Sequence, residues 1–223
     1  MKKERYDYSG FSLKKLNDPR FSHALLLLGW LGYFAMYFIT ENLIPFDRCH
    51  EVHCFIDDII PFNEYFLIFY TGWYLLVIGS LAYTFFYDVQ RFKELQTYIM
   101  LTQGLAMLCY IIYPTIQNLR PEVFPRDNIF TDILGFIYRF DTPTGVCPSL
   151  HVGYSIAILS VAFKDKTLFR MTKIILLILV VLISLSTCFV KQHSFVDTLV
   201  AVPMCAIAEM IVYGKYWKNR ISR

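Results

Sequence analysis

Six long apolar stretches dominate the pattern of hydrophobic and polar positions along the chain. A helix needs roughly 20 mostly apolar residues to cross a hydrocarbon core of about 30 Å. The stretches are continuous rather than alternating, which favours helices, because lipid satisfies no backbone polar group. We therefore predict an all-α integral membrane protein with six transmembrane helices, at Ser22–Thr40, Tyr65–Tyr87, Tyr98–Gln117, Pro148–Phe163, Ile174–Val190 and Ser194–Tyr213.

Composition supports this class and indicates one domain. Hydrophobic residues make up 56% of the chain and charged residues only 17%, whereas soluble domains carry about 25% charged residues. We expect a basic arm at residues 1–21, a six-span domain at 22–213 and a basic tail at 214–223. The arm is polar and basic, so we expect no cleavable signal peptide before the first span.

The basic residues are unevenly divided between the two predicted sides. The termini and the loops after the second and fourth spans hold sixteen of the 21 Lys and Arg residues, and the other loops hold five. By the positive-inside rule, both termini are expected to be cytoplasmic. The loops at about 41–64, 118–147 and 191–193 then lie on the outer side, in a multi-pass protein of the cell membrane.

The outer loops carry structure of their own. Ile129, Ile133, Phe136 and Ile137 recur at helical spacing, which predicts a short amphipathic helix at the membrane interface. A similar element is expected near Phe55–Phe62. The fourth span has about sixteen residues, or roughly 24 Å of helix, so its first turn is expected to lie below the outer membrane surface.

The first outer loop also contains Cys49-His50-Glu51-Val52-His53-Cys54. These side chains can bind metals, but the spacing is too tight for the usual paired zinc ligands. A disulfide between Cys49 and Cys54, or two free thiols, is the favoured interpretation.

His193 and Asp197 are four residues apart at the start of the sixth span. At that spacing both side chains share one helix face. A carboxylate bound to one imidazole nitrogen leaves the other nitrogen free as a nucleophile or base. An unpaired carboxylate inside a membrane is costly, so Asp197 needs a partner. The alternative is a structural pair that braces the helix end.

Two further polar groups are predicted at the same depth. Pro148-Ser149-Leu150-His151 opens the fourth span, where helix N–H groups form an anion site and His151 is a candidate general acid. Arg120 offers a planar fork of donors suited to phosphate, and Lys191 offers a point charge. Alone, the tetrapeptide is better explained by an N-cap serine with an interfacial histidine, and Arg120 or Lys191 is more often a snorkelling side chain. Together they indicate phosphoryl transfer without a metal or cofactor.

These sites resemble the signature of the type 2 phosphatidic acid phosphatase superfamily, whose motifs are Lys, six residues, Arg-Pro; Pro-Ser-Gly-His; and Ser-Arg, five residues, His, three residues, Asp. The resemblance covers about 22–213. It implies that Arg120, Ser149 and the N–H groups around Leu150 bind phosphate, and that His151 protonates the leaving alcohol. It also implies that His193 forms a phosphohistidine and that Asp197 orients it.

Three departures from that signature affect the prediction. Tyr113 stands in place of the family's Lys, Leu150 replaces Gly, and Thr187 replaces Arg. Lys191, one helical turn from Thr187, is the candidate substitute for the lost Arg. Further candidates for substrate contact are Tyr113, Arg139 and Asp141. The Pro-Ser-Leu-His form is similar to the branch that contains inositol phosphorylceramide synthases.

Three functions therefore remain open. The first is hydrolysis of a lipid phosphate or diphosphate, such as a phosphatidate, phosphatidylglycerol phosphate or polyprenyl diphosphate. The second is transfer of a phosphoryl head group onto a lipid alcohol, and the third is a relative that has lost activity. A transporter is disfavoured, because no chain of ionisable residues crosses the predicted spans. The expected partners are a lipid substrate and the bilayer, with no nucleic acid.

Overall fold

The computed structural model describes residues 4–221, with side chains described as far as Lys218. The ends of the predicted arm and tail, 1–3 and 222–223, lie outside the described residues. The chain is mostly helical, as expected for an all-α membrane protein. Its α-helices are α1 Gly29–Leu43, α2 Phe55–Ile59, α3 Leu67–Tyr87, α4 Val89–Ile112, α5 Ile129–Phe140, α6 Leu150–Lys164, α7 Arg170–Phe189 and α8 Phe195–Ile221.

Short 3₁₀ turns and two short strands complete the chain. The 3₁₀ segments are Leu13–Lys15, Ser22–Leu28, Phe46–Arg48 and Glu64–Phe66, and two of them lead directly into α1 and α3. Strands β1 (His50–Glu51) and β2 (Thr115–Ile116) pair in parallel. Counting these extensions, five segments are long and apolar enough to cross a membrane: Ser22–Leu43, Glu64–Tyr87, Val89–Ile112, Arg170–Phe189 and Phe195–Lys218.

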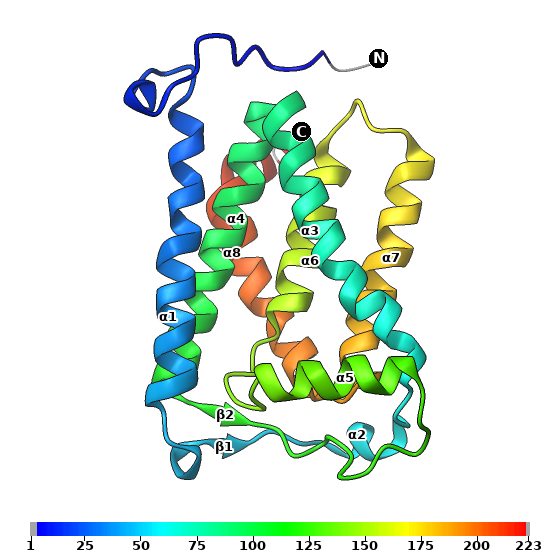
Figure 1. The fold of residues 1–223 in the computed structure, drawn as a ribbon. Helices are drawn as coiled ribbons and strands as arrows, with labels where there is room; N and C mark the ends of the chain where they lie inside the picture. The colour runs from blue at the N-terminus through cyan, green and yellow to red at the C-terminus, as the bar shows by residue number, and fades with distance from the viewer. Residues whose placement is uncertain (1–3, 222–223) are drawn as a thin grey trace.

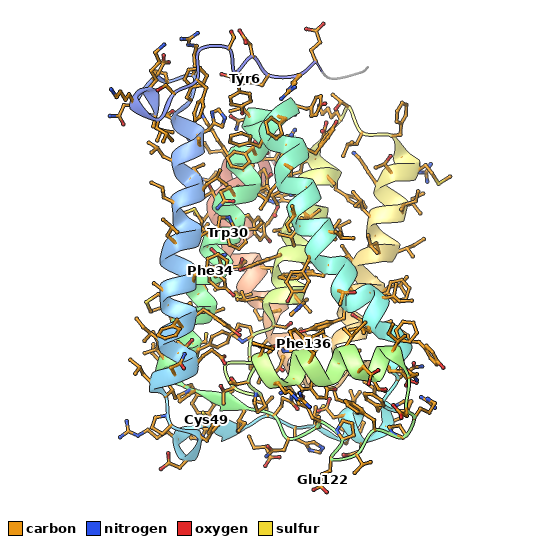
Figure 2. The ribbon with its side chains drawn as sticks, in the orientation of Figure 1. Tyr6, Trp30, Phe34, Cys49, Glu122 and Phe136 are labelled. Atoms are coloured by element: carbon orange, nitrogen blue, oxygen red, sulfur yellow. The ribbon has the colours of Figure 1, made fainter. Side chains whose placement is uncertain are left out.

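The long helices form one bundle with two different ends (Figure 1). Both chain ends lie at one end, which we call the terminal end. The opposite loop end carries α2, α5, β1 and β2, and α5 lies across the bundle there. Cys49 and Glu122 lie at the loop end, far from Tyr6 at the terminal end (Figure 2). The predicted amphipathic helix is therefore present as α5, and α2 lies within the second predicted element.

Helix α6 is the centre of the bundle. It contacts α3, α4, α7 and α8, and it spans 15 residues, about 22 Å. Small residues allow this close packing, as is usual between membrane helices. A Cβ on Gly153 would come within 3.0 Å of Met204 on α8. The predicted fourth span is thus an apolar helix shorter than its neighbours.

The third predicted span is wrong at both ends. Helix α4 begins at Val89, where the Asp88 carboxylate accepts a hydrogen bond from the N–H of Arg91 and caps the first turn. It ends at Ile112 rather than Gln117, because Pro114 disfavours helical backbone at Tyr113 and cannot donate an N–H. The residues after Pro114 form β2 instead. The last helix also differs from its prediction, since it continues past Tyr213 into the expected tail.

Candidate functional site

The imidazole of His193 lies against the carboxylate of Asp197, as their spacing predicts. His193 Nδ1 is 3.1 Å from Asp197 Oδ2, and both residues are buried. A carboxylate only accepts hydrogen bonds, so in the neutral imidazole Nδ1 carries the proton and Nε2 keeps the free electron pair. The same Oδ2 accepts a bond of 3.0 Å from the N–H of Ser194, which fixes the carboxylate at the first turn of α8.

The start of α6 is joined to this pair through the backbone. The N–H of Ser149 donates to the carbonyl oxygen of Asp197 at 3.1 Å, and the Tyr110 hydroxyl donates to the carbonyl of Pro148 at 2.6 Å. Ser149 is the N-cap of α6, yet its fully buried hydroxyl has no hydrogen-bond partner among the described residues. Helix α6 begins at Leu150. Its first N–H groups and the Ser149 hydroxyl together form a concentrated set of hydrogen-bond donors.

His151 follows one residue into α6 and lies beside His193, with their ring centroids 5.5 Å apart. The aromatic rings of Tyr70 and Trp73 on α3 hold the His151 ring, with centroid distances of 4.6 and 4.2 Å. Its Nε2 atom is buried and has no partner in the described part of the chain. The ring is therefore oriented by packing, and one nitrogen is available to a ligand.

Arg120 reaches the same region from the loop before α5. Its guanidinium donates to Gln192 Oε1 at 2.5 Å and to the carbonyl of Tyr138 at 3.2 Å. Burial lowers the pKa of Arg120, and the Asp141 carboxylate opposes this shift; the group stays cationic. Its Nε–H is buried without a partner among the residues described. Arg120 can thus donate to a bound anion without breaking its anchoring bonds.

Asp141 joins this network through the amide of Gln192. Gln192 Nε2 donates to Asp141 Oδ2 at 3.3 Å, and the Tyr37 hydroxyl donates to Asp141 Oδ1 at 2.9 Å. The buried amide of Gln192 therefore bridges the Arg120 cation and the Asp141 carboxylate. Asp141, one of the predicted substrate contacts, therefore binds the same amide that holds Arg120.

The ammonium group of Lys191 is bound by backbone carbonyl groups of the first loop. Its Nζ donates to the carbonyl oxygens of Asp57 and Ile60, at 2.8 and 2.6 Å. Lys191 was expected to substitute for the Arg of the family signature because it lies one helical turn from Thr187, which requires that the helix continues from Thr187 to Lys191. Helix α7 ends at Phe189, and Lys191 has the left-handed φ of 53° that turns the chain away.

Two more predicted contacts lie outside this cluster. Tyr113 is more than half exposed and stacks on His50, with ring centroids 4.1 Å apart. Arg139 is exposed on α5. Neither shares a described contact with the His193 cluster, so the structure does not bring these two residues together with the other candidates.

The sequence analysis did not select Asp57, Gln192 or Cys147, which also belong to this cluster. Asp57 accepts a hydrogen bond from the N–H of Phe195, and Gln192 accepts one from the guanidinium of Arg120. Cys147 precedes α6, and burial, together with the nearby Asp197 carboxylate, raises the pKa of its thiol to about 12. The thiol therefore stays protonated. Its position immediately before Pro148 was the one available signal.

The loop-end cysteines and histidines do not form a metal cluster among the residues described. No group of three or more His, Cys, Asp and Glu side chains is close enough to hold an ion in that part of the chain. Cys49 and Cys54 are free thiols. The His53 imidazole binds Asp58 instead, at 2.8 Å, which raises the pKa of His53.

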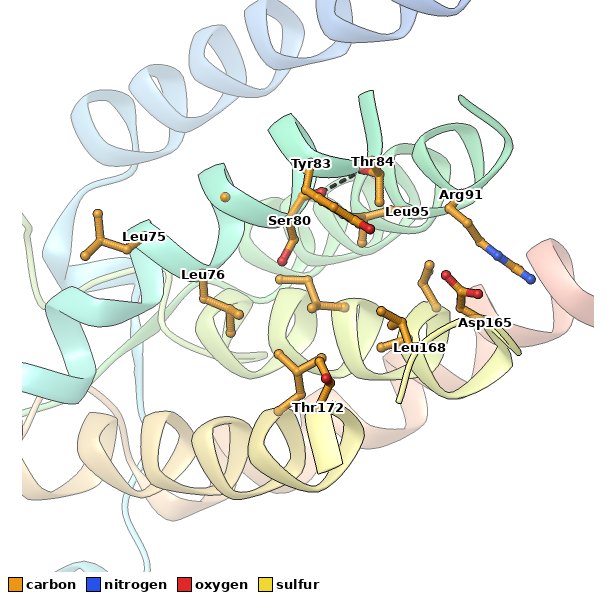
Figure 3. A pocket seen from close by; sticks show the side chains of 15 residues that line it. Leu75, Leu76, Ser80, Tyr83, Thr84, Arg91, Leu95, Asp165, Leu168 and Thr172 are labelled. Atoms are coloured by element: carbon orange, nitrogen blue, oxygen red, sulfur yellow. Dashed lines mark hydrogen bonds between the residues drawn. The ribbon is translucent and has the colours of Figure 1, made fainter. Parts of the chain in front are cut away.

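A cavity of about 340 Å³ lies at the other end of the bundle (Figure 3). Its walls come from α3, α4, α6 and α7 and are mainly apolar, with Arg91 and Asp165 at one side. It shares no residue with the His193 cluster. Arg91 is already paired with Glu94 at 2.6 Å and with the carbonyl of Lys164 at 3.1 Å.

The cluster combines one braced imidazole, a second imidazole, a guanidinium and a helix N-terminus with an unused hydroxyl. These groups suit a tetrahedral oxyanion that is attacked by His193 Nε2, and His151 lies close enough to exchange a proton with a departing group. Comparison of the chain with protein-family models, curated proteins and solved structures found no match.

Proposed function

We propose that this chain is an integral membrane enzyme that hydrolyses a lipid phosphate or diphosphate ester through a phosphohistidine intermediate. The observation that carries the proposal is that His193, bound to Asp197, lies beside His151 and the start of α6, while Arg120 is anchored on the adjacent Gln192. Buried polar atoms of Arg120, Ser149 and His151 have no partner among the described residues. Motifs that resemble the type 2 phosphatidic acid phosphatase signature supply these residues.

In the proposed reaction, His193 Nε2 attacks phosphorus and the bond to the ester oxygen breaks. Asp197 stabilises the positive charge on the ring, and His151 gives its proton to the departing alcohol. Arg120, the Ser149 hydroxyl and the first N–H groups of α6 bind the phosphoryl oxygens. Water then attacks the phosphohistidine, releases inorganic phosphate and restores both histidines.

We further infer that α6 provides a sixth crossing and that both termini are cytoplasmic. The shared terminal end supports an even number of crossings, and the excess of Lys and Arg at that end supports its cytoplasmic placement. The His193 cluster would then face the extracytoplasmic side. Labelling by a membrane-impermeant maleimide in intact cells tests this, because the loop thiols Cys49 and Cys54 are expected to react and a cysteine introduced at Ser9 is not.

Enzymatic activity can be tested with purified full-length protein in proteoliposomes. Phosphatidate, phosphatidylglycerol phosphate and a polyprenyl diphosphate are supplied separately, and inorganic phosphate is measured with and without diacylglycerol or ceramide as acceptor. Release of phosphate from one lipid without acceptor supports hydrolysis. A new phospholipid formed only with acceptor identifies the transferase alternative. No phosphate release and no new lipid in any combination would refute both.

A further inference from the structure

A short helix of the first loop is bound to the turn that carries His193. Asp57 on α2 is buried, and its Oδ2 accepts a hydrogen bond from the Ser194 hydroxyl at 2.5 Å. Its Oδ1 accepts one from the N–H of Phe195 at 2.8 Å. Phe195 is the first residue of α8, so this carboxylate caps the helix that bears Asp197.

The same carboxylate also caps its own helix. Asp57 Oδ2 accepts a bond from the N–H of Cys54 at 2.9 Å, within the capping box of α2. One side chain therefore satisfies the N-termini of two helices that are far apart in the sequence. A carboxylate serves here because it has enough lone pairs for three donors.

Lys191 forms a second link between the same two segments, from a side chain of the turn to the backbone of α2. Its ammonium group, which extends from the turn, binds the carbonyl oxygens of Asp57 and Ile60 at the C-terminal side of α2. Carbonyl groups at the end of a helix have no partner within it, and a cation there is favourable. Lys191 and Asp57 thus hold α2 and the 191–195 turn together from both sides.

We propose that Asp57 and Lys191 are positioning residues that fix the 191–195 turn so that His193 faces His151 and the α6 N-terminus. This inference rests on the proposed function for its catalytic consequence and on the contacts above for its geometry. The left-handed backbone of Lys191 is costly for a residue with a side chain. A glycine would adopt it freely, so the lysine side chain compensates for that cost by binding α2.

The contacts of Lys191 favour a positioning role over direct binding of phosphate. Both nearby acceptors of Lys191 are backbone carbonyls, and the ammonium group is largely buried. Loss of either residue should therefore let His193 drift while Arg120, Ser149 and the α6 N-terminus remain in place to bind phosphate. A displacement of about 1 Å at a reacting group can lower the rate by roughly 10²-fold.

The first test measures hydrogen–deuterium exchange of the purified full-length protein in detergent. Asp57→Asn is compared with Asp58→Asn, a matched change on the same helix, where Asp58 is exposed and binds only His53 among the described residues. We expect faster exchange in peptides covering 190–199 in Asp57→Asn and wild-type rates in Asp58→Asn. Ser194→Ala, which removes one of the three bonds, should give an intermediate rate. Wild-type exchange in Asp57→Asn would overturn the proposal.

The second test separates rate from binding, on whichever lipid phosphate the wild type hydrolyses. Lys191→Met should lower kcat by about 10- to 100-fold and change the inhibition constant of inorganic phosphate less than about threefold. Lys191→Arg, which can still reach two carbonyls, should recover most of kcat. A tenfold weaker phosphate inhibition with kcat unchanged would make Lys191 a phosphate ligand and refute positioning. A wild-type protein without activity would refute the proposed function, and the exchange result would still decide the geometry.

Discussion

The backbone N–H of Ser149 and the backbone carbonyl of Asp197 are hydrogen-bonded at 3.1 Å. This bond joins the N-terminus of α6 to the first turn of α8, so two helix N-termini meet at one point. The α6 end contributes its first N–H groups and the positive end of its helix dipole, whereas the first N–H groups of α8 are already bound by Asp57 and by the Ser194 hydroxyl. The arrangement suits an anion between Ser149 and His193, as the proposed reaction requires.

Replacement of His193 by Ala should abolish turnover, because it removes the imidazole that Asp197 orients. We expect phosphate release to fall by at least about 10³-fold. His53→Ala is the matched control, because His53 lies in the first loop and its side chain is exposed. Acid-labile ³²P labelling of the wild type during turnover, absent in His193→Ala, would identify the intermediate. Equal labelling of both proteins contradicts the assignment.

His151→Ala should slow the step in which the alcohol leaves. The effect, roughly 10²- to 10⁴-fold for general acid catalysis, depends on how basic the leaving oxygen is. A lipid alkyl phosphate should lose most of its rate, whereas an aryl phosphate with an acidic phenol should lose little. Both substrates are assayed side by side on the same protein preparation. An equal loss for the two would assign His151 to binding rather than to proton transfer.

Gln192→Leu should free the guanidinium of Arg120. The variant removes the acceptor of a 2.5 Å bond and separates Arg120 from Asp141. We expect KM to rise by about tenfold, because a guanidinium that is free to rotate binds phosphate less well. Gln90→Leu, on an exposed side chain at the terminal end that binds Glu94, is the control. Wild-type KM in Gln192→Leu would show that Arg120 is oriented without the bridge.

Acid should weaken the link made by Asp57. Burial alone raises the pKa of this carboxyl, but hydrogen bonds from Ser194, Phe195 and Cys54 outweigh it, and the pKa is lowered from 3.8. The stability that Asp57 contributes is therefore complete above that value and is lost as pH falls through the lower folded-state pKa.

Thermal melts of wild type and Asp57→Asn in detergent, from pH 7 to pH 2.5, measure this contribution. The difference in Tm should be constant down to about pH 4 and should shrink below it. A difference that grows on acidification would mean that the folded-state pKa is raised instead.

The sequence predicted features that depend on neighbouring positions. The contact between His193 and Asp197 follows from helical spacing, and α5 follows from the recurrence of its apolar residues. Both are local, so periodicity is sufficient to find them.

The sequence could not reveal contacts that depend on how the chain returns on itself. Asp57 and Ser194 are separated by 137 residues, and no pattern near Asp57 marks it as a partner of the last helix. The sequence also could not show that Lys191 binds α2, because spacing arguments apply only within one continuous helix, and α7 ends before Lys191. The hydropathy pattern also does not predict the pairing of β1 with β2, because each strand has only two residues.

The short length of α6 limits which insertions in the sequence this protein can tolerate. Longer neighbours surround α6, so the bilayer does not set its length as it does for a lipid-facing helix. Insertion of one turn would move Ser149 and His151 by about 5.4 Å relative to α8 and separate them from His193, while the outline presented to lipid stayed the same. The length of this one enclosed helix is therefore constrained by the alignment of chemical groups and is independent of membrane thickness.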